Sequence, residues 1–206
     1  MNRPGRWPVI EMSRRSGLKS TIQCIARLLL IAVCCSLLPL ESANCEELRL
    51  QSLSLRGRIS GATLLGEQQP EQFQGYDLAA HFALSWQRYS PAGWGIGTRL
   101  MASAGLLRGA GDTGLVVSLI PGMALGSADS RWALDAGAGV ALLSRSRFGT
   151  QDFGGPFQFA LTLGASFPVY QQVGLSYRFV HYSDAGVNGD NTIGADFHML
   201  EFSWRL

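Results

Sequence analysis

The chain beyond residue 45 contains no cysteine and no lysine. All four cysteines and the only lysine lie within the first 45 of its 206 residues. Without a thiol, the rest of the chain can form neither a disulfide nor a cysteine-ligated metal site. Charge is also scarce, since only 16% of the residues are charged and the formal net charge is +2. So balanced a chain lacks the basic surface that nucleic-acid binding needs, and its 47% hydrophobic content argues against a disordered chain.

The first 45 residues have the composition of a secretory signal peptide. Six basic and two acidic residues precede or flank the uncharged run 28–40. A bilayer-spanning helix needs about twenty residues, so this run is too short to cross a membrane. Small side chains at Ala43 and Cys45 suit cleavage after Cys45. We therefore expect residues 1–45 to be a signal peptide, with Met12 as an alternative start, and residues 46–206 to be an exported domain; a membrane anchor is the competing interpretation.

Beyond residue 45, apolar residues recur at every second position. Strict alternation of this kind predicts strands with two different faces. It is clearest in the segments 77–87, 94–106, 132–142, 157–167 and 200–206. Weaker candidates lie near 48–60, 114–125 and 171–183, which brings the total to eight. The segment 48–60 is the least regular, because its alternation slips between Leu50 and Leu53.

The two faces of these segments differ in a way that favours a membrane barrel. One face carries bulky aromatic residues and the other carries many glycines and polar residues. The aromatic set is Trp86, Trp94, Trp132, Phe157, Phe167 and Trp204. A polar, glycine-rich face could not form the dry core of a soluble sandwich or a lipocalin-like barrel, the alternative folds.

The connections between the segments also follow the pattern of outer-membrane barrels, in which short turns lie at one end and long loops at the other. Short connections fall near 89–93, 126–131 and 168–171, and the others near 61–74, 109–113, 144–155 and 184–195. We predict an all-β, eight-stranded antiparallel up-and-down transmembrane β-barrel, with its termini on the periplasmic side and the second group of loops facing outward. An eight-stranded barrel has an interior that side chains fill, so no pore is expected.

One segment places a histidine and a serine together. His181 and Ser183 stand two residues apart on the apolar face of the segment 171–183, where their Cβ atoms would lie about 7 Å apart. At that separation a histidine can act as the base for a serine nucleophile. If residue 183 lies opposite residue 196, Asp196 of the last strand approaches the pair from the same face. A carboxylate beside lipid is costly and needs a reason, although the pattern also fits ordinary interfacial residues.

The run from Tyr177 to Gly186, YRFVHYSDAG, followed by Asn191 and a final strand, resembles the lipid A 3-O-deacylase family. Members of that family are eight-stranded outer-membrane barrels with the motif His-Tyr-Ser-Asn-Ala-Gly before the last strand. The resemblance is sharp over residues 173–206 and looser at 157–159. It implies that His181 and Ser183 form a lipid-facing triad with Asp196, which stands where the family has a glutamate.

The resemblance also implies an activity and a location. The protein would be a serine esterase that removes the 3-linked 3-hydroxyacyl chain from lipid A of lipopolysaccharide. It would need no cofactor and no metal, and it would work in the outer membrane with its active site facing the outer leaflet. Arg145 and Arg147, on a predicted outward loop, could pair with lipid A phosphates, although solvated loop charge is an equal interpretation.

Two departures from the family motif bear on activity. Asp196 is one methylene shorter than glutamate, and Asp184 replaces an asparagine whose amide can help to hold an oxyanion. An ionised Asp184 would repel that oxyanion, which leaves open a protonated carboxylate, a carboxylate turned away, or reduced activity. Asn191 matches a family asparagine and is a second candidate for supporting the oxyanion.

Other functions remain compatible with the sequence. A non-enzymatic small outer-membrane barrel for adhesion or structure is one, and an esterase acting on phospholipid is another. Lipid A and the outer membrane are the expected partners, nucleic acid is not, and a homodimer is open. The three histidines, His81, His181 and His198, are scattered along the chain, and His81 is predicted inside the barrel.

Overall fold

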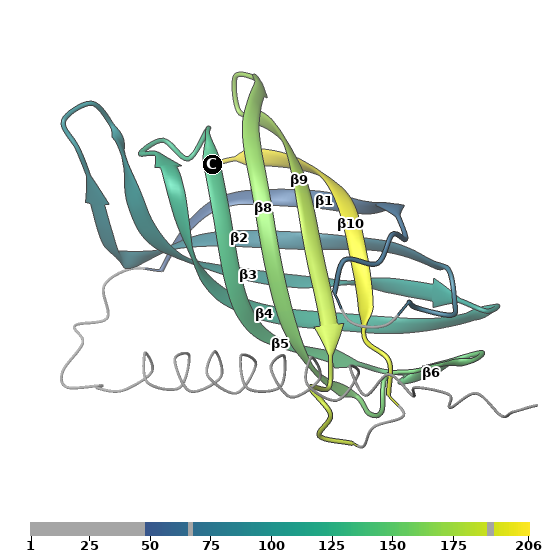
Figure 1. Ribbon diagram of the computed structural model, residues 1–206. Helices are drawn as coiled ribbons and strands as arrows, with labels where there is room; N and C mark the ends of the chain where they lie inside the picture. The colour runs from purple at the N-terminus through teal and green to yellow at the C-terminus, as the bar shows by residue number, and fades with distance from the viewer. Residues whose placement is uncertain (1–47, 66–67, 189–191) are drawn as a thin grey trace, which may run out of the picture. The chain divides into compact units, whose positions relative to one another are not determined.

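The barrel is the main feature of the computed structural model, which describes residues 48–65, 68–188 and 192–206. Within these ranges eight strands close an antiparallel barrel in the order β1-β10-β9-β8-β5-β4-β3-β2 (Figure 1). The expected signal peptide, residues 1–45, lies outside the described residues. No helix in the described ranges is long and apolar enough to cross a membrane.

The strands follow the alternation of the sequence. The barrel strands are β1 (Arg49–Ser60), β2 (Phe73–Tyr89), β3 (Trp94–Gly109), β4 (Asp112–Ser127), β5 (Ala133–Leu143), β8 (Phe157–Tyr170), β9 (Val173–Ser183) and β10 (Ala195–Arg205). A separate hairpin consists of β6 (Arg147–Phe148) and β7 (Gln151–Asp152). The prediction of an eight-stranded antiparallel barrel is confirmed, and all eight expected segments become barrel strands.

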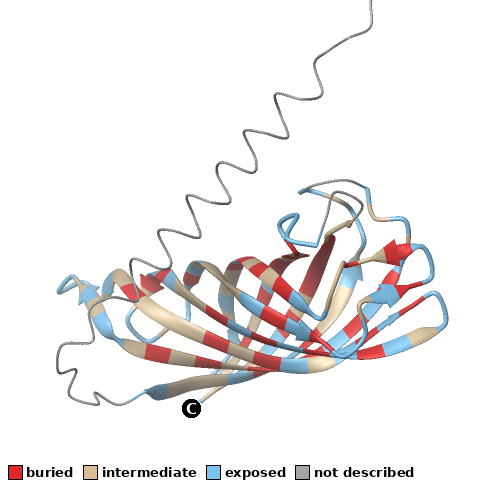
Figure 2. Cartoon of the chain, turned by 90° about the horizontal axis from the view of Figure 1, so that it is seen from below, coloured by how far each residue is buried: buried red, intermediate tan, exposed pale blue. Residues whose placement is uncertain are grey.

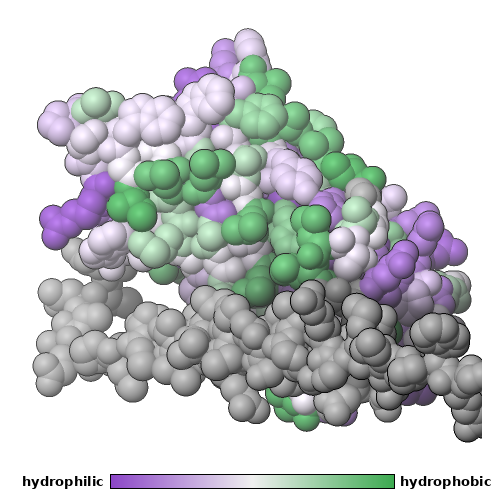
Figure 3. All heavy atoms as spheres, in the orientation of Figure 1, coloured by the Kyte–Doolittle hydropathy of each residue, from purple (hydrophilic) through white to green (hydrophobic). Residues whose placement is uncertain are grey.

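The barrel carries its apolar residues on the outside. Along β2, buried and exposed positions alternate, with Asp77 and His81 buried inside and Leu78 exposed outside. Bands of buried and exposed residues cross each strand in Figure 2, and apolar residues gather across the face in view in Figure 3. This arrangement is the reverse of a soluble sandwich and is typical of a barrel surrounded by lipid.

Strand β1 is irregular where its sequence pattern is irregular. Its register with β2 shifts between Leu50 and Ser52, within the stretch where the alternation slips. A bulge adds one residue to one strand, so the side chains beyond it change face. The irregular spacing of leucines in this segment therefore reflects a bulge in a true strand.

The connection between β3 and β4 is shorter than expected. Only Ala110 and Gly111 separate the two strands, and both have positive φ, 50° and 85°. Two such residues in succession form the tight turn that matches the twist of paired strands. Strands β3 and β4 are each 16 residues long and β2 is 17, which is longer than the segments 94–106, 114–125 and 77–87 expected from the sequence.

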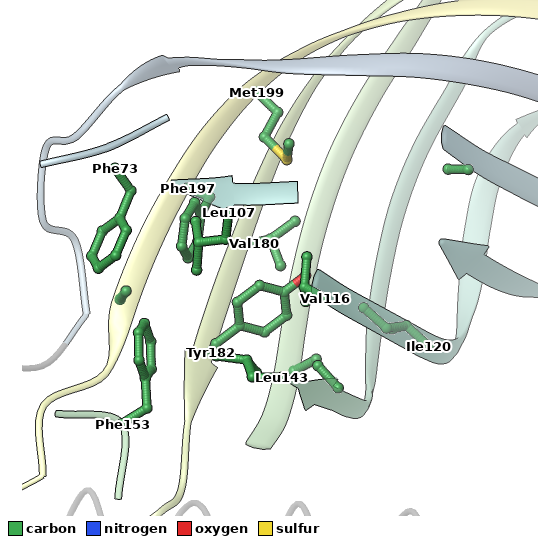
Figure 4. Close-up of a cluster of buried hydrophobic side chains, with 14 of the residues drawn as sticks. Phe73, Leu107, Val116, Ile120, Leu143, Phe153, Val180, Tyr182, Phe197 and Met199 are labelled. Carbon is green, nitrogen blue, oxygen red and sulfur yellow. The ribbon is translucent and has the colours of Figure 1, made fainter. Parts of the chain in front are cut away.

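An aromatic cluster fills the interior at the end of the barrel where the long loops lie, which we call the loop end. Phe73 and Phe197 come from barrel strands, and Phe153 directly follows the hairpin β6–β7 (Figure 4). Phe148 belongs to the hairpin and packs on Phe73, with ring centroids 5.4 Å apart. Phe148 and Phe153 are almost fully buried. The expected polar, glycine-rich interior is therefore wrong for this end, because loop residues outside the alternating segments fold inward and fill it.

The rest of the interior carries charge that is paired. Arg178 donates hydrogen bonds to Glu201 and to Asp135, each at 2.7 Å. Arg56 donates to Asp77 at 2.5 Å. Buried charges are tolerated when each has a partner and hydrogen bonds, so these pairs account for the polar residues on the inner face.

Candidate active site

His181 and Asp196 lie directly opposite each other on β9 and β10. The antiparallel register pairs Asp196 with His181 and Ala195 with Tyr182. The pattern of the sequence had suggested residue 196 opposite residue 183, so the true register differs by two residues. Because side chains alternate with a period of two, this shift keeps Asp196 on the predicted face and moves it next to the histidine.

A hydrogen bond joins this pair. His181 Nδ1 lies 2.6 Å from Asp196 Oδ1. An ionised carboxylate only accepts hydrogen bonds, so Nδ1 carries the proton in this contact. The neutral ring then presents a lone pair at Nε2, which is the tautomer that a general base requires.

Ser183 ends β9 and lies close to the same glycine, Gly194, as His181 does. Its Oγ accepts a hydrogen bond from the backbone N–H of Ala185 at 3.1 Å. A β carbon at Gly194 would lie 3.0 Å from His181 Cε1 and 3.3 Å from Ser183 Cβ. Together with the Tyr182 carbonyl oxygen at 2.8 Å, these contacts leave no room for a side chain at residue 194, and they show that the histidine and the serine lie against the same glycine.

The carboxylate of Asp184 points into the loop between β9 and β10. It is buried and accepts hydrogen bonds from Gly186 N at 3.0 Å, Asn188 N at 3.1 Å and Thr192 Oγ1 at 2.8 Å. Of the alternatives that the sequence left open, this geometry matches a carboxylate turned away from the serine. An ionised Asp184 cannot donate a hydrogen bond to an oxyanion. Its hydrogen bonds instead stabilise the loop between β9 and β10. The other support candidate, Asn191, lies outside the described residues.

Arg145 and Arg147 each have a carboxylate partner on the loops. Arg145 Nη1 lies 3.2 Å from Asp112 Oδ2, and Arg147 donates hydrogen bonds to Asp152. Hydrogen bonds from Arg147 and from Gly154 N hold the pKa of Asp152 below its ordinary value. Phosphate binding by either arginine would require it to exchange or share this partner.

The loop between β1 and β2 supplies contacts that the sequence analysis did not anticipate. Asp196 Oδ2 accepts hydrogen bonds from the backbone N–H groups of Leu64, at 2.5 Å, and Leu65, at 2.8 Å. Gln69 Oε1 accepts the N–H of Asp196 at 3.1 Å. These bonds explain how a carboxylate can stand on the apolar outer face. Backbone N–H groups carry no residue-specific signal, so no motif could have revealed them.

The same loop is tied to the loop between β5 and β8. Glu71 Oε1 accepts hydrogen bonds from the backbone N–H and the hydroxyl of Thr150, at 3.0 and 2.8 Å. These two donors hold the pKa of Glu71 below its ordinary value. The loop that contacts Asp196 is thereby fixed at a second point.

The three histidines occupy three different environments. His81 lies in the barrel interior, as predicted, with Nε2 2.9 Å from Glu201 Oε1. His198 shares the outer face of β10 with Asp196 and contacts Tyr177 and Ala62. Within the described ranges, no three histidine, cysteine, aspartate or glutamate side chains gather as a metal site would require.

The fold is similar to that of a solved outer-membrane enzyme. The solved structure described as "Crystal structure of the outer membrane enzyme PagL" superposes with a TM-score of 0.60 at 20% identity, covering 75% of this chain and 99% of that one. The Yersinia pestis outer membrane protein Ail gives a TM-score of 0.41 at 13% identity, covering 77% of this chain and 100% of that one. No curated protein sequence matches the chain.

The sequence model of one family covers most of the barrel. The family described as "Lipid A 3-O-deacylase (PagL)" matches residues 74–205, from the start of β2 to the end of β10. Together with the barrel fold, this match supports a location in the outer membrane. Since the match extends over more than half of the sequence, the chain belongs to the lipid A 3-O-deacylase (PagL) family.

Proposed function

We propose that this protein is an outer-membrane serine esterase that removes the 3-linked 3-hydroxyacyl chain from lipid A. The observation that carries the proposal is the hydrogen-bonded pair His181–Asp196 on the apolar outer face, with Ser183 beside it. An aligned acid and histidine next to a serine is the arrangement that activates a hydroxyl for attack on an ester. Family membership supplies the class of substrate.

The reaction follows from these three side chains. His181 Nε2 takes the proton of Ser183 Oγ as the oxygen attacks the acyl carbonyl carbon, and Asp196 stabilises the imidazolium that forms. When the tetrahedral intermediate collapses, the C–O bond to the sugar breaks and His181 returns the proton to the sugar hydroxyl. Water then attacks the acyl-serine with His181 again as base, which releases the fatty acid and restores Ser183.

The surroundings of the serine suit a lipid substrate. On the neighbouring strand β8, Phe159 lies opposite Ser183 and Leu161 lies opposite His181. Phe157 packs edge-on against Phe159, with ring centroids 5.4 Å apart. An acyl chain that reaches Ser183 from the bilayer would contact these apolar side chains. Since lipid A occupies the outer leaflet, we place the loop end of the barrel outward.

Hydrogen-bond donors near Ser183 could stabilise the developing negative charge. The N–H of Ala185 already lies 3.1 Å from Ser183 Oγ. Unlike an ionised Asp184, this neutral donor would not repel a negatively charged oxygen. Preorganised backbone N–H groups commonly fill this role in acyl transfer. Asn191 stays a second candidate, and Arg145 and Arg147 stay candidates for the lipid A phosphates.

Mass spectrometry of lipid A after incubation with the refolded barrel tests the proposal. Wild-type protein should remove one 3-hydroxyacyl chain, whereas Ser183→Ala should remove none and the matched control at an exposed serine, Ser85→Ala, should behave as wild type. An intact lipid A after incubation with folded wild-type protein would favour a non-enzymatic barrel. Fatty acid release from phospholipid vesicles in a parallel incubation, with lipid A unchanged, would favour a phospholipid esterase.

A further inference from the structure

Residues 61–65, which we call the strap, lie against the outer face of β10. In Figure 1 the loop between β1 and β2 runs beside the end of β10. The strap contacts that strand through Leu64 N and Leu65 N, which donate to Asp196 Oδ2, and through Ala62 O, which lies 2.9 Å from His198 Nε2. A loop that could have extended into solvent is instead hydrogen-bonded to the candidate catalytic acid.

His198 anchors the strap. A carbonyl oxygen can only accept, so His198 Nε2 carries the proton in its contact with Ala62, and Nδ1 accepts from the hydroxyl of Tyr177 at 2.5 Å. The ring also packs on Phe179, with centroids 5.3 Å apart. Both ring nitrogens are occupied and the residue is buried, so His198 has no free atom for the proposed reaction.

The strap matters because Asp196 stands on an apolar surface with a short side chain. The two carboxylate oxygens have different partners. Oδ1 accepts from His181, and Oδ2 accepts hydrogen bonds from two backbone N–H groups of the strap. Three donors satisfy a carboxylate that lipid would otherwise leave unsolvated, and they fix its orientation. The side chains of Leu64 and Leu65 are exposed, at 65% and 42%, so backbone N–H groups make the contact with Asp196.

We propose that the strap holds Asp196 in the position that orients His181, with Leu64 and Leu65 acting through their backbone N–H groups and His198 acting as the anchor. These three are positioning residues, since none of them touches the reacting atoms. The expected effect of the strap on turnover rests on the proposed esterase function. The expected effect of the strap on the hydrogen bond between His181 and Asp196 does not depend on that function.

Paired substitutions separate the backbone of the strap from its side chains. Leu64→Pro removes one N–H donor, whereas Leu64→Ala keeps it. His198→Leu removes the anchor, whereas the amide of His198→Gln can still donate to Ala62 O. Leu64→Pro removes a donor to the Asp196 carboxylate directly, and His198→Leu releases the strap that carries both donors. Each change should weaken the alignment of Asp196 and lower kcat about tenfold, with KM changed less than about twofold. Leu64→Ala and His198→Gln should stay within about threefold of wild type.

Proton NMR of the folded barrel in detergent micelles gives a readout independent of activity. The Nδ1 proton of His181, bonded to Asp196, should appear at low field in wild type. It should move upfield or broaden by exchange in Leu64→Pro and His198→Leu but stay in place in Leu64→Ala and His198→Gln. The Asp196→Asn variant shows where the His181 resonance lies when the charge of the carboxylate is removed. Urea unfolding followed by tryptophan fluorescence identifies any variant that fails to fold.

The outcomes distinguish the two proposals. A displaced His181 resonance in the two disruptive variants, in a barrel that leaves lipid A intact, would support the strap and count against the esterase. An active wild type whose kcat and resonance are unchanged in Leu64→Pro and His198→Leu would overturn the strap. An equal loss of kcat in Leu64→Ala and Leu64→Pro would also overturn it, because the side chain would then be responsible.

Discussion

The barrel contains two pairs of a histidine with a carboxylate, one outside and one inside. Outside, His181 Nδ1 lies 2.6 Å from Asp196 Oδ1 in an aligned hydrogen bond. Inside, His81 Nε2 lies 2.9 Å from Glu201 Oε1, at ion-pair distance but without hydrogen-bond alignment. The two pairs share their chemistry, yet their surroundings differ in the charge that each carboxylate meets.

Arg178 hydrogen-bonds the carboxylate of Glu201 directly. The carboxylate oxygens of Asp196 instead accept from backbone N–H groups and a histidine, and the nearby Arg58 donates to the backbone carbonyl of Asp196 at 3.1 Å. Arg178 donates to Glu201 at 2.7 Å, and Ser54 donates at 3.0 Å. A carboxylate committed to a buried arginine contributes mainly to holding the barrel together. The hydrogen bonds printed on the Asp196 side chain leave its charge facing the imidazole, where it can stabilise an imidazolium. We therefore expect the outer pair to govern activity and the inner pair to govern stability.

The largest expected effect is on turnover at the outer histidine. His181→Gln removes the base, so kcat for lipid A deacylation should fall at least about a thousandfold while the barrel still folds. The same substitution inside, His81→Gln, should leave kcat per folded molecule within about twofold. Release of 3-hydroxy fatty acid, normalised to folded protein, measures both variants. A comparable loss of kcat in His181→Gln and His81→Gln would contradict the assignment of activity to the outer pair alone.

The next largest effect is on stability at the inner carboxylate. Glu201→Gln keeps the shape of the side chain but leaves the buried guanidinium of Arg178 with one fewer charge partner, which should cost about 3 kcal/mol of unfolding free energy. Asp112→Asn, at an exposed ion pair with Arg145, should cost less than about 1 kcal/mol. Urea unfolding in lipid vesicles measures the difference. Equal midpoints for the two variants would show that the inner network does not carry the stability assigned to it.

A smaller effect is expected when the outer acid is lengthened. Asp196→Glu restores the residue type of the family but displaces the carboxylate by one methylene from a position that now satisfies His181, Leu64 and Leu65 together. We expect kcat to fall about tenfold, through the loss of these aligned contacts. A rise in kcat would instead mean that aspartate at this position is a handicap, as the sequence alone suggested.

The smallest effect is expected at Asp184. Asp184→Asn removes one of the acceptors that hold the loop between β9 and β10, so kcat should fall by about threefold. Thr192→Val, which removes a donor to the same carboxylate, should act in the same direction. If charge repulsion at the oxyanion were the dominant effect, Asp184→Asn would raise kcat while Thr192→Val would not.

The sequence was sufficient to predict the barrel and the face that carries the candidate site residues. Alternation with a period of two assigns each residue to a face, and the pattern holds along the strands apart from irregularities such as the bulge in β1. His181, Ser183 and Asp196 could be placed on one face for that reason, even though the assumed register was wrong by two residues. A motif match then supplied the chemistry of the pair, which spacing alone left open.

Only the tertiary structure decided how the acid is held. The register that sets Asp196 against His181 depends on the whole closed ladder of strands. The donors to its second oxygen are backbone N–H groups of a loop more than 130 residues earlier in the chain. Every residue except proline carries such a group, so composition and spacing cannot mark the ones that matter. The sequence therefore determined which side chains share the outer face, and the fold determined which of them meet.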